Sequence, residues 1–167
     1  NNRKLISLGG WCGPAVSLQE LKIRNEAMPF DYMHASLRAI NYITRGYNKY
    51  FFDTRLCIFP HHKIKEPKVR EDLNRRIERF QNTLKNNNQP ILFVRSVTNI
   101  NYQYELEQIK EFLNLVKNKY SRNSDKVLMI LHSQNIGTMK LKIINSNIMV
   151  SCAEGTVGWH VPNRSNI

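Results

Sequence analysis

Two short, wholly apolar segments separated by one amphipathic segment constrain the fold of this chain more than any other feature. The apolar segments are residues 91–94 (Ile-Leu-Phe-Val) and 127–131 (Val-Leu-Met-Ile-Leu), and each has the length of a strand. Between them, residues 102–120 repeat apolar side chains at helical spacing, which predicts an amphipathic helix. Continuous apolar strands joined through a helix are typical of a right-handed βαβ unit with buried parallel strands. The sequence therefore predicts an α/β fold with a mainly parallel central sheet.

The remaining segments extend this pattern to a three-layer α/β domain in which helices flank the sheet. Further elements are expected at residues 5–8 (strand), 36–44 and 68–85 (helices), and 141–144 and 148–150 (two strands). The last two segments surround an Asn-Ser-Asn turn, which predicts a C-terminal β-hairpin. A chain of 167 residues is most simply one domain, residues 1–167.

A cysteine stands between the first expected strand and the first expected helix. Gly9 and Gly10 allow a sharp turn before Cys12, and Pro14 suits the first turn of a helix. Cys12 would then face unpaired amides and the positive end of the helix dipole, which favours the nucleophilic thiolate. The amides of residues 10–13 could also hold an oxyanion. The alternative is that Cys12 packs in the core as a small hydrophobic side chain.

Polar side chains follow both apolar segments. Arg95 and Ser96 come after the first segment, and His132 and Ser133 come after the second. Because ligands bind outside the carboxyl ends of parallel strands, these residues are expected to share one crevice with the glycine–cysteine loop.

Several short motifs occur in a specific order and spacing along residues 4 to 135. They are Ser7-Leu8-Gly9, Cys12, Pro29-Phe30-Asp31-Tyr32, His61, Arg75-Arg76, Arg79-Phe80 and Arg95. This pattern resembles a family of papain-like cysteine peptidases of unknown function that has members in bacteria and large DNA viruses. Tyr32 stands where the family usually has Trp, and His62 stands where an acidic residue is usual.

The resemblance implies a cysteine hydrolase that acts on a peptide, isopeptide or related acyl bond. Cys12 would attack the carbonyl, and a histidine would take up the thiol proton and return it to the leaving group. The candidate bases, in order, are His61, His132 and His62. Asp31 would orient the imidazole or a substrate amine, or alternatively cap the following helix. This chemistry needs no cofactor.

The residues expected to contact substrate are of two kinds: those around Cys12, and arginines able to hold an anion or carboxylate. They are Gly10, Trp11, Gly13, Arg75, Arg76, Arg79 and Arg95. Alternatively, the arginines of the 68–85 helix are surface charges whose stems cover the edge of the core.

The family name and the apolar pattern imply different architectures. A papain-like fold pairs a cysteine-bearing helix with an antiparallel sheet that bears the histidine, whereas the apolar segments predict a parallel sheet. The pattern is the stronger guide to architecture because residues 90–132 are strongly periodic. A Cys–His site can recur on unrelated folds.

The charge balance suggests other partners. Lys and Arg number 25 against 13 Asp and Glu, a net charge of +12, which favours nucleic acid, an anionic membrane face or an acidic partner. Solvated helix faces are the alternative, and no aromatic-glycine RNA-binding signature is present. A non-catalytic basic binding module is therefore the second hypothesis. Transfer chemistry on an anionic or sugar substrate held by the arginines is the third.

The three cysteines, Cys12, Cys57 and Cys152, suggest neither a disulfide framework nor a zinc site, because their number is odd and their spacing wide. No metal site is expected. Free thiols indicate a reducing compartment, most simply the cytoplasm, or the host cytoplasm for a viral protein. No apolar run reaches membrane-spanning length and no signal peptide is visible.

Overall fold

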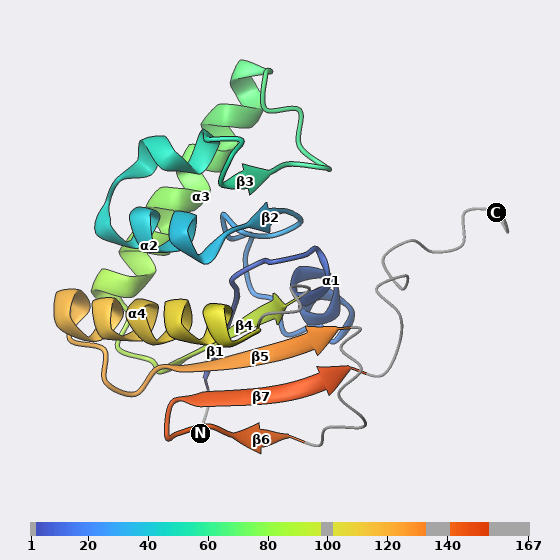
Figure 1. The fold of residues 1–167 in the computed structure, drawn as a ribbon. Coiled ribbons are helices and arrows are strands. Elements are labelled where there is room, and N and C mark those ends of the chain that lie inside the picture. Colours follow the sequence, from blue (N-terminus) through green and yellow to red (C-terminus); the bar gives the residue numbers. More distant parts are fainter. Residues whose placement is uncertain (1–2, 98–101, 133–140, 154–167) are drawn as a thin grey trace, which may run out of the picture.

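The computed structural model describes residues 3–97, 102–132 and 141–153 and has a mixed α/β fold (Figure 1). In chain order its elements are β1 Lys4–Ser7, α1 Gly13–Glu20, β2 His34–Ala35, α2 Leu37–Arg45, the 3₁₀ helix η1 Asn48–Phe52, β3 Cys57–Ile58, α3 Pro67–Asn86, β4 Ile91–Val97, α4 Tyr102–Tyr120, β5 Lys126–His132, β6 Lys142–Ile143 and β7 Ile148–Ala153. The short elements β2 and η1 were not expected from the sequence pattern. None of the described helices is long and apolar enough to cross a membrane.

The central sheet has five strands in the order β1-β4-β5-β7-β6. The first four are mutually parallel, and β6 runs antiparallel to β7. This confirms both the mainly parallel sheet and the C-terminal hairpin. The β4–α4–β5 unit is the one that the two apolar segments predict, and it puts the ends of β1, β4 and β5 at one edge of the sheet (Figure 1).

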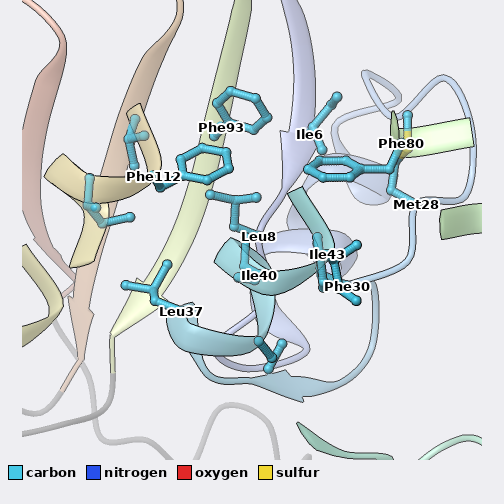
Figure 2. Packing of buried hydrophobic residues seen from close by; sticks show 14 of the residues in the cluster. Ile6, Leu8, Met28, Phe30, Leu37, Ile40, Ile43, Phe80, Phe93 and Phe112 are labelled. Atoms are coloured by element: carbon cyan, nitrogen blue, oxygen red, sulfur yellow. The ribbon is translucent and has the colours of Figure 1, made fainter. Parts of the chain in front are cut away.

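The main hydrophobic core lies between one face of the sheet and helices α2, α3 and α4 (Figures 1 and 2). Phe93 of β4 packs edge-on against Phe112 of α4, with ring centroids 5.0 Å apart. Phe80 of α3 packs in the same way on Phe30, at 5.2 Å. Fully burying an aromatic side chain contributes a few kcal/mol, so contacts of this kind hold the helices on the sheet.

Helix α1 covers part of the opposite face. Its residues Ala15 and Leu18, together with Val94 of β4, are buried but do not belong to the main core cluster. Successive side chains of a strand point to opposite faces of the sheet. Phe93 and Arg95 therefore face α4, whereas Val94 and Ser96 face α1. The cysteine loop thus enters a second, smaller apolar layer.

A two-stranded antiparallel sheet precedes α2. In this sheet β2 pairs with β3, so that His34 lies opposite Ile58. Helix α2 then begins because Ser36 is its N-cap, with the Ser36 hydroxyl accepting a hydrogen bond from the Ala39 amide at 3.1 Å. It ends at Gly46, whose φ of +101° is the left-handed conformation common after helices.

A buried ion pair holds the amino edge of the sheet. Arg122 Nε lies 2.5 Å from Asp125 Oδ2, and the same guanidinium donates to the carbonyls of Asn87 and Gln89. Asp125 also accepts a hydrogen bond from the Ile91 amide at 2.8 Å. These bonds join the starts of β4 and β5, and both charges are fully hydrogen-bonded, as burial requires.

Candidate active site

Two glycines hold the loop between β1 and α1 against the end of β4. Gly9 and Gly10 have φ angles of +63° and +84°, which residues with a side chain rarely adopt. The Ser96 amide donates a hydrogen bond to the Gly9 carbonyl at 3.1 Å. A Cβ atom on Gly10 would lie 2.0 Å from the Ser96 carbonyl oxygen. The turn expected from the sequence is therefore present, and the backbone of β4 occupies the space that a side chain at position 10 would need.

Cys12 is the N-cap of α1, but its surroundings do not favour the thiolate. The residue is 9 % exposed. Burial raises the pKa of Cys12, and a hydrogen bond with its own backbone amide opposes that effect only in part. The prediction of a lowered pKa at the mouth of the helix is therefore wrong, because the loss of hydration outweighs the amide. At neutral pH Cys12 is a thiol.

His34, which no sequence pattern indicated, lies against the cysteine loop. Its ring meets the ring of Trp11 edge-on, with centroids 4.1 Å apart. Burial lowers the pKa of His34, a backbone hydrogen bond with Gly10 opposes this, and the charges of Arg95 and His61 lower it further. His34 is therefore a neutral imidazole at pH 7. The strand that carries His34 has two residues, which is too short to give a periodic signal. The remaining sequence signal for His34 is its position between the Pro-Phe-Asp turn and the N-cap of α2.

Two further histidines, His61 and His62, lie in the same part of the structure, and His61 is near both His34 and His62. His61 is exposed, and it is close enough to His34 and His62 to lower the pKa of each. His62 is half-buried, which lowers its pKa, and its Nε2 lies 3.4 Å from the Asp31 carbonyl oxygen. The fold therefore places His34 against the cysteine loop, with His61 near it and His62 near His61. Within the described part of the chain, no hydrogen bond joins any of them to the Cys12 sulfur.

The second candidate base, His132, is the last residue of β5. Its side chain lies outside the described residues, as does the whole of Ser133. The β5 backbone reaches the same edge of the sheet as the end of β4, because Val97 pairs with Leu131. The assignment of His132 as a base stays a prediction.

The raised pKa of Cys57, on β3, predicts a loss of folding stability at alkaline pH. Burial, with the nearby charge of Asp53, raises the pKa of Cys57 from 9.0 to about 12. Above pH 9 the unfolded chain releases this proton and the folded chain keeps it, so folding stability falls as the pH rises towards 12. We expect a loss of about 2 kcal/mol between pH 9 and about pH 10.5, measured by urea unfolding. Cys57→Ala should show a shallower decline, and equal declines in the two proteins would contradict the assignment.

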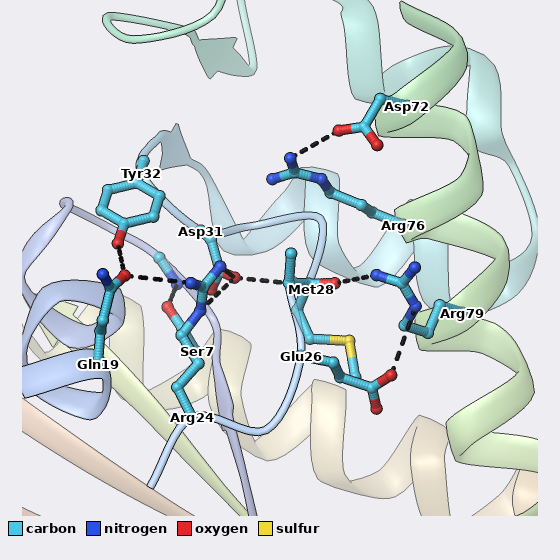
Figure 3. Close-up of polar contacts among 12 residues, drawn as sticks. Ser7, Gln19, Arg24, Glu26, Met28, Asp31, Tyr32, Asp72, Arg76 and Arg79 are labelled. Carbon is cyan, nitrogen blue, oxygen red and sulfur yellow. Dashed lines mark hydrogen bonds and ion pairs between the residues drawn. The ribbon is translucent and has the colours of Figure 1, made fainter. Parts of the chain in front are cut away.

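The Asp31 carboxylate holds a turn together. Its Oδ2 accepts hydrogen bonds from the Met28 amide at 2.8 Å and from Arg24 at 2.7 and 3.1 Å (Figure 3). Burial raises the pKa of Asp31, although the Met28 amide and Arg24 act against this. The carboxylate does not cap α2, because Ser36 does. Nor does it hydrogen-bond to a histidine ring among the described residues, where only its backbone carbonyl approaches His62.

This arrangement predicts that Asp31 acts mainly on stability. Asp31→Ala would leave the Met28 amide and the Arg24 charge without their buried acceptor, so we expect the free energy of unfolding to fall by about 2 to 4 kcal/mol. Asp31→Asn, which keeps one acceptor oxygen, should lose less. Urea unfolding measures both changes, and any hydrolytic activity should fall only with the folded fraction. A hundredfold loss of activity at unchanged stability would instead make Asp31 an orienting residue.

Three of the arginines expected to hold an anion lie on α3, and each has protein groups as its partners. Arg75 is exposed and forms ion pairs with acidic residues of its own helix. Arg76 pairs with Asp72 at 2.6 Å, and Arg79 donates to the Ala27 carbonyl at 2.5 Å (Figure 3). Each guanidinium is engaged by a carboxylate or a carbonyl of the protein, so these contacts give no support to transfer chemistry on an anion clamped by the three side chains.

The fourth arginine, Arg95, is buried beneath the glycine loop. Its guanidinium donates to the carbonyls of Leu8 and Ala35 and pairs with Glu105 of α4. These contacts replace the predicted anion-binding role with contacts inside the protein. Among the described residues, no cluster of three or more His, Cys, Asp or Glu side chains could hold a metal ion.

A family model described as "Putative papain-like cysteine peptidase" matches the chain over two overlapping segments, residues 3–58 and 47–135. The chain belongs to this family. Neither a curated protein nor a solved structure matches it. Membership in the family supports a cysteine hydrolase in this coarse sense, and the matched segments contain Cys12 and the three histidines His34, His61 and His62.

The motifs that carry the family resemblance meet one another in space. Phe30 of the Pro-Phe-Asp turn packs on Phe80 of α3, and a Cβ atom on Gly9 would lie 2.8 Å from the Phe30 carbonyl oxygen. Arg79 donates to the chain just before that turn, and Arg95 donates to the residue before Gly9. Most of the pattern therefore builds the scaffold around the cysteine loop.

Proposed function

We propose that this protein is a cysteine hydrolase in which Cys12 is the nucleophile and His34 is the general base. The observation that carries the proposal is the position of the His34 ring, 4.1 Å from the ring of Trp11, which directly precedes Cys12. Family membership supplies the reaction class. His61, the residue that the family resemblance favours, is the alternative base. The effects of His34→Asn and His61→Asn on kcat distinguish the two.

The two pKa shifts define the resting state of this pair. Burial raises the pKa of Cys12 and lowers that of His34, so both groups are uncharged at neutral pH. The imidazole then removes the thiol proton as the sulfur attacks, rather than holding a preformed thiolate. This differs from cysteine sites in which a helix terminus and a charged histidine keep the sulfur ionised at rest.

The proposed reaction has two halves. In the first, the Cys12 sulfur bonds to the substrate carbonyl carbon, its proton passes to the imidazole, and the oxyanion faces the amides of residues 10–13. The tetrahedral species then expels the amine, which takes the proton from the imidazolium, and an acyl thioester remains on Cys12. In the second half, the same imidazole deprotonates a water molecule that hydrolyses the thioester and restores the thiol. The substrate is a peptide, isopeptide or related acyl compound.

Trapping the thioester tests this proposal directly. The protein is mixed with an activated peptidyl ester, quenched in acid, and analysed by intact mass and peptide mapping. The expected result is one acyl group on Cys12 that disappears on incubation at neutral pH. Cys12→Ala should give no adduct and Cys152→Ala should behave as the parent protein. Absence of the adduct, or acylation of Cys152 alone, would reject the proposal.

Substitution of the histidines separates the candidate bases. We expect His34→Asn to lower kcat by about 10² to 10⁴, because the thiol loses its proton acceptor, and His61→Asn to lower it less than tenfold. Since the pKa of His34 lies below its ordinary value of 6.5, the rate of the parent protein should decline only below that pH. A larger loss in His61→Asn would assign the base to His61.

A second candidate function, binding of single-stranded nucleic acid, is favoured by a column of tyrosines and cations. The rings of Tyr42 and Tyr50 stack at 4.3 Å, Arg38 lies 5.7 Å over Tyr42, and Lys49 lies 5.1 Å over Tyr50. Arg38 also donates a hydrogen bond to the Tyr42 hydroxyl at 3.2 Å, and among the described residues neither cation has a carboxylate partner, so both charges are available to phosphates.

Salt dependence tests this second function. An oligonucleotide should bind at least tenfold more weakly at 200 mM than at 50 mM salt, and Arg38→Ala with Lys49→Ala should weaken it further. Cys12→Ala should bind normally. Unchanged binding in the double variant would reject the surface, and binding of an acidic peptide in place of the oligonucleotide would assign it to a protein partner.

A further inference from the structure

The Arg95 guanidinium connects two segments that are distant in sequence. Arg95 lies near the end of β4 and its side chain is 4 % exposed. Its Nη1 donates to the Leu8 carbonyl at 3.0 Å and to the Ala35 carbonyl at 2.6 Å. Leu8 precedes the Gly9–Gly10 turn that leads to Cys12, and Ala35 directly follows His34. One nitrogen therefore fixes the backbone on both sides of the proposed nucleophile–base pair.

Position 10 is shaped to let the guanidinium approach. A Cβ atom on Gly10 would lie 3.0 Å from Arg95 Cζ and 3.1 Å from its Nε. The absence of a side chain on Gly10 thus brings the loop backbone directly onto the guanidinium. This close packing makes the position of the loop depend on the position of one side chain.

Glu105 of α4 fixes the guanidinium from the opposite side. Its carboxylate lies 3.0 Å from Arg95 Nε and 3.3 Å from Nη2, and the Glu105 side chain is 13 % exposed. A buried charge needs such a partner, and a two-point contact with a carboxylate also sets the plane of the guanidinium. A lysine at position 95 would carry the charge but could not reproduce the planar fork.

We propose that Arg95, held by Glu105, is a positioning residue that sets the placement of Cys12 relative to His34. It acts through the backbone of both segments and does not touch the substrate. This inference rests on the proposed function, because Cys12 and His34 are the pair that it positions. It predicts that loosening Arg95 has two opposite effects: the buried thiol becomes more accessible to small reagents, while hydrolysis becomes slower.

The amino edge of the same sheet provides a matched control. Arg122 and Asp125 form another buried arginine–carboxylate pair, with side-chain exposures of 7 % and 1 %. This pair also binds backbone carbonyls, but it lies at the opposite end of β4 and β5 from the cysteine loop. A variant there disturbs a comparable ion pair without altering the contacts of the loop.

The experiment compares Arg95→Lys with Arg122→Lys in the full chain. Alkylation of Cys12 by iodoacetamide at pH 7, resolved by peptide mapping, is the first measurement, and urea unfolding places the two variants on one stability scale. We expect Cys12 in Arg95→Lys to react at least tenfold faster than in the parent protein, and in Arg122→Lys to react within about twofold of it. In a hydrolysis assay, kcat should fall about a hundredfold in Arg95→Lys with KM little changed, because misplacement by about 1 Å costs this much.

Glu105→Gln provides a second, milder variant should Arg95→Lys not fold. It keeps one acceptor for the guanidinium, and we expect a smaller change in the same direction. Equal alkylation rates in the Arg95 and Arg122 variants would overturn the positioning role and leave an ordinary structural ion pair. Absence of hydrolysis in the parent protein would instead overturn the proposed function, and the alkylation comparison would still be readable.

Discussion

Replacing Cys12 by alanine is expected to lower the rate of acyl hydrolysis by at least about a thousandfold, because no other group in the loop can form the thioester. The free energy of unfolding should change by less than about 1.5 kcal/mol, since the side chain is small and makes no capping hydrogen bond. Single-turnover kinetics with an activated peptidyl ester measure the rate, and urea unfolding measures the stability.

Cys152→Ala is the matched control for this experiment. Cys152 is a half-buried free cysteine on β7, so its loss should leave hydrolysis within about twofold of the parent rate. Retention of a tenth or more of the activity in Cys12→Ala would show that the thiol is not the nucleophile. The family membership would then have to be explained by a role that does not use this sulfur.

Gly10→Ala is expected to lower the free energy of unfolding by about 4 kcal/mol. The new Cβ atom would lie 2.0 Å from the Ser96 carbonyl oxygen, a separation that the backbone must move to relieve. The φ angle of +84° adds strain of about 1 to 2 kcal/mol for a residue with a side chain. Urea unfolding measures the loss, and Cys12 should alkylate faster because the displaced loop exposes it.

Gly46→Ala separates the clash from the backbone strain. Gly46 also has a positive φ, +101°, but its missing Cβ would meet only the flexible end of Lys119, at 3.9 Å. The expected loss is therefore that of strain alone, about 1 to 2 kcal/mol. If both glycine variants lost the same stability, the contact between the loop and Ser96 would not be what fixes position 10.

The proposed site combines Cys12, whose pKa is raised, with His34, whose pKa is lowered. Both shifts have the same physical cause, the loss of hydration, which favours the uncharged form of each group. A neutral pair of this kind becomes reactive only when the imidazole accepts the proton during attack. The positions of the two rings and of the loop therefore matter more to the rate than the resting charge of the sulfur does.

Several elements could be predicted from the sequence because their signal is local and repeated. Strands β4 and β5 are continuous apolar runs, and α4 was expected at residues 102–120, where the structure has Tyr102–Tyr120. The glycine turn was predictable for a related reason, since two adjacent glycines before a proline-started helix allow few conformations. The position of Cys12 between a strand and a helix could be predicted for the same reason, because the signals of both elements lie next to it in the sequence.

The histidine beside the cysteine loop could not be predicted in the same way. His34 reaches the loop because β2 pairs with β3, and a two-residue strand carries no periodicity. The raised pKa of Cys12 could not be predicted either, because the burial that raises it depends on how α1 packs against the sheet. The position of Arg95 after an apolar strand predicts an anion ligand, whereas in the structure the carbonyls of Leu8 and Ala35 and the Glu105 carboxylate surround its guanidinium.

The sequence by itself thus determined which segments become strands and helices and where Cys12 lies between them. The reason is that each segment contains its own pattern of apolar and polar side chains. Tertiary structure alone decided which imidazole lies against the cysteine loop, how much water reaches the thiol, and what the buried arginine binds. Those outcomes depend on contacts between residues up to 87 positions apart, such as Arg95 and Leu8. Such contacts leave no mark in the spacing of neighbouring residues.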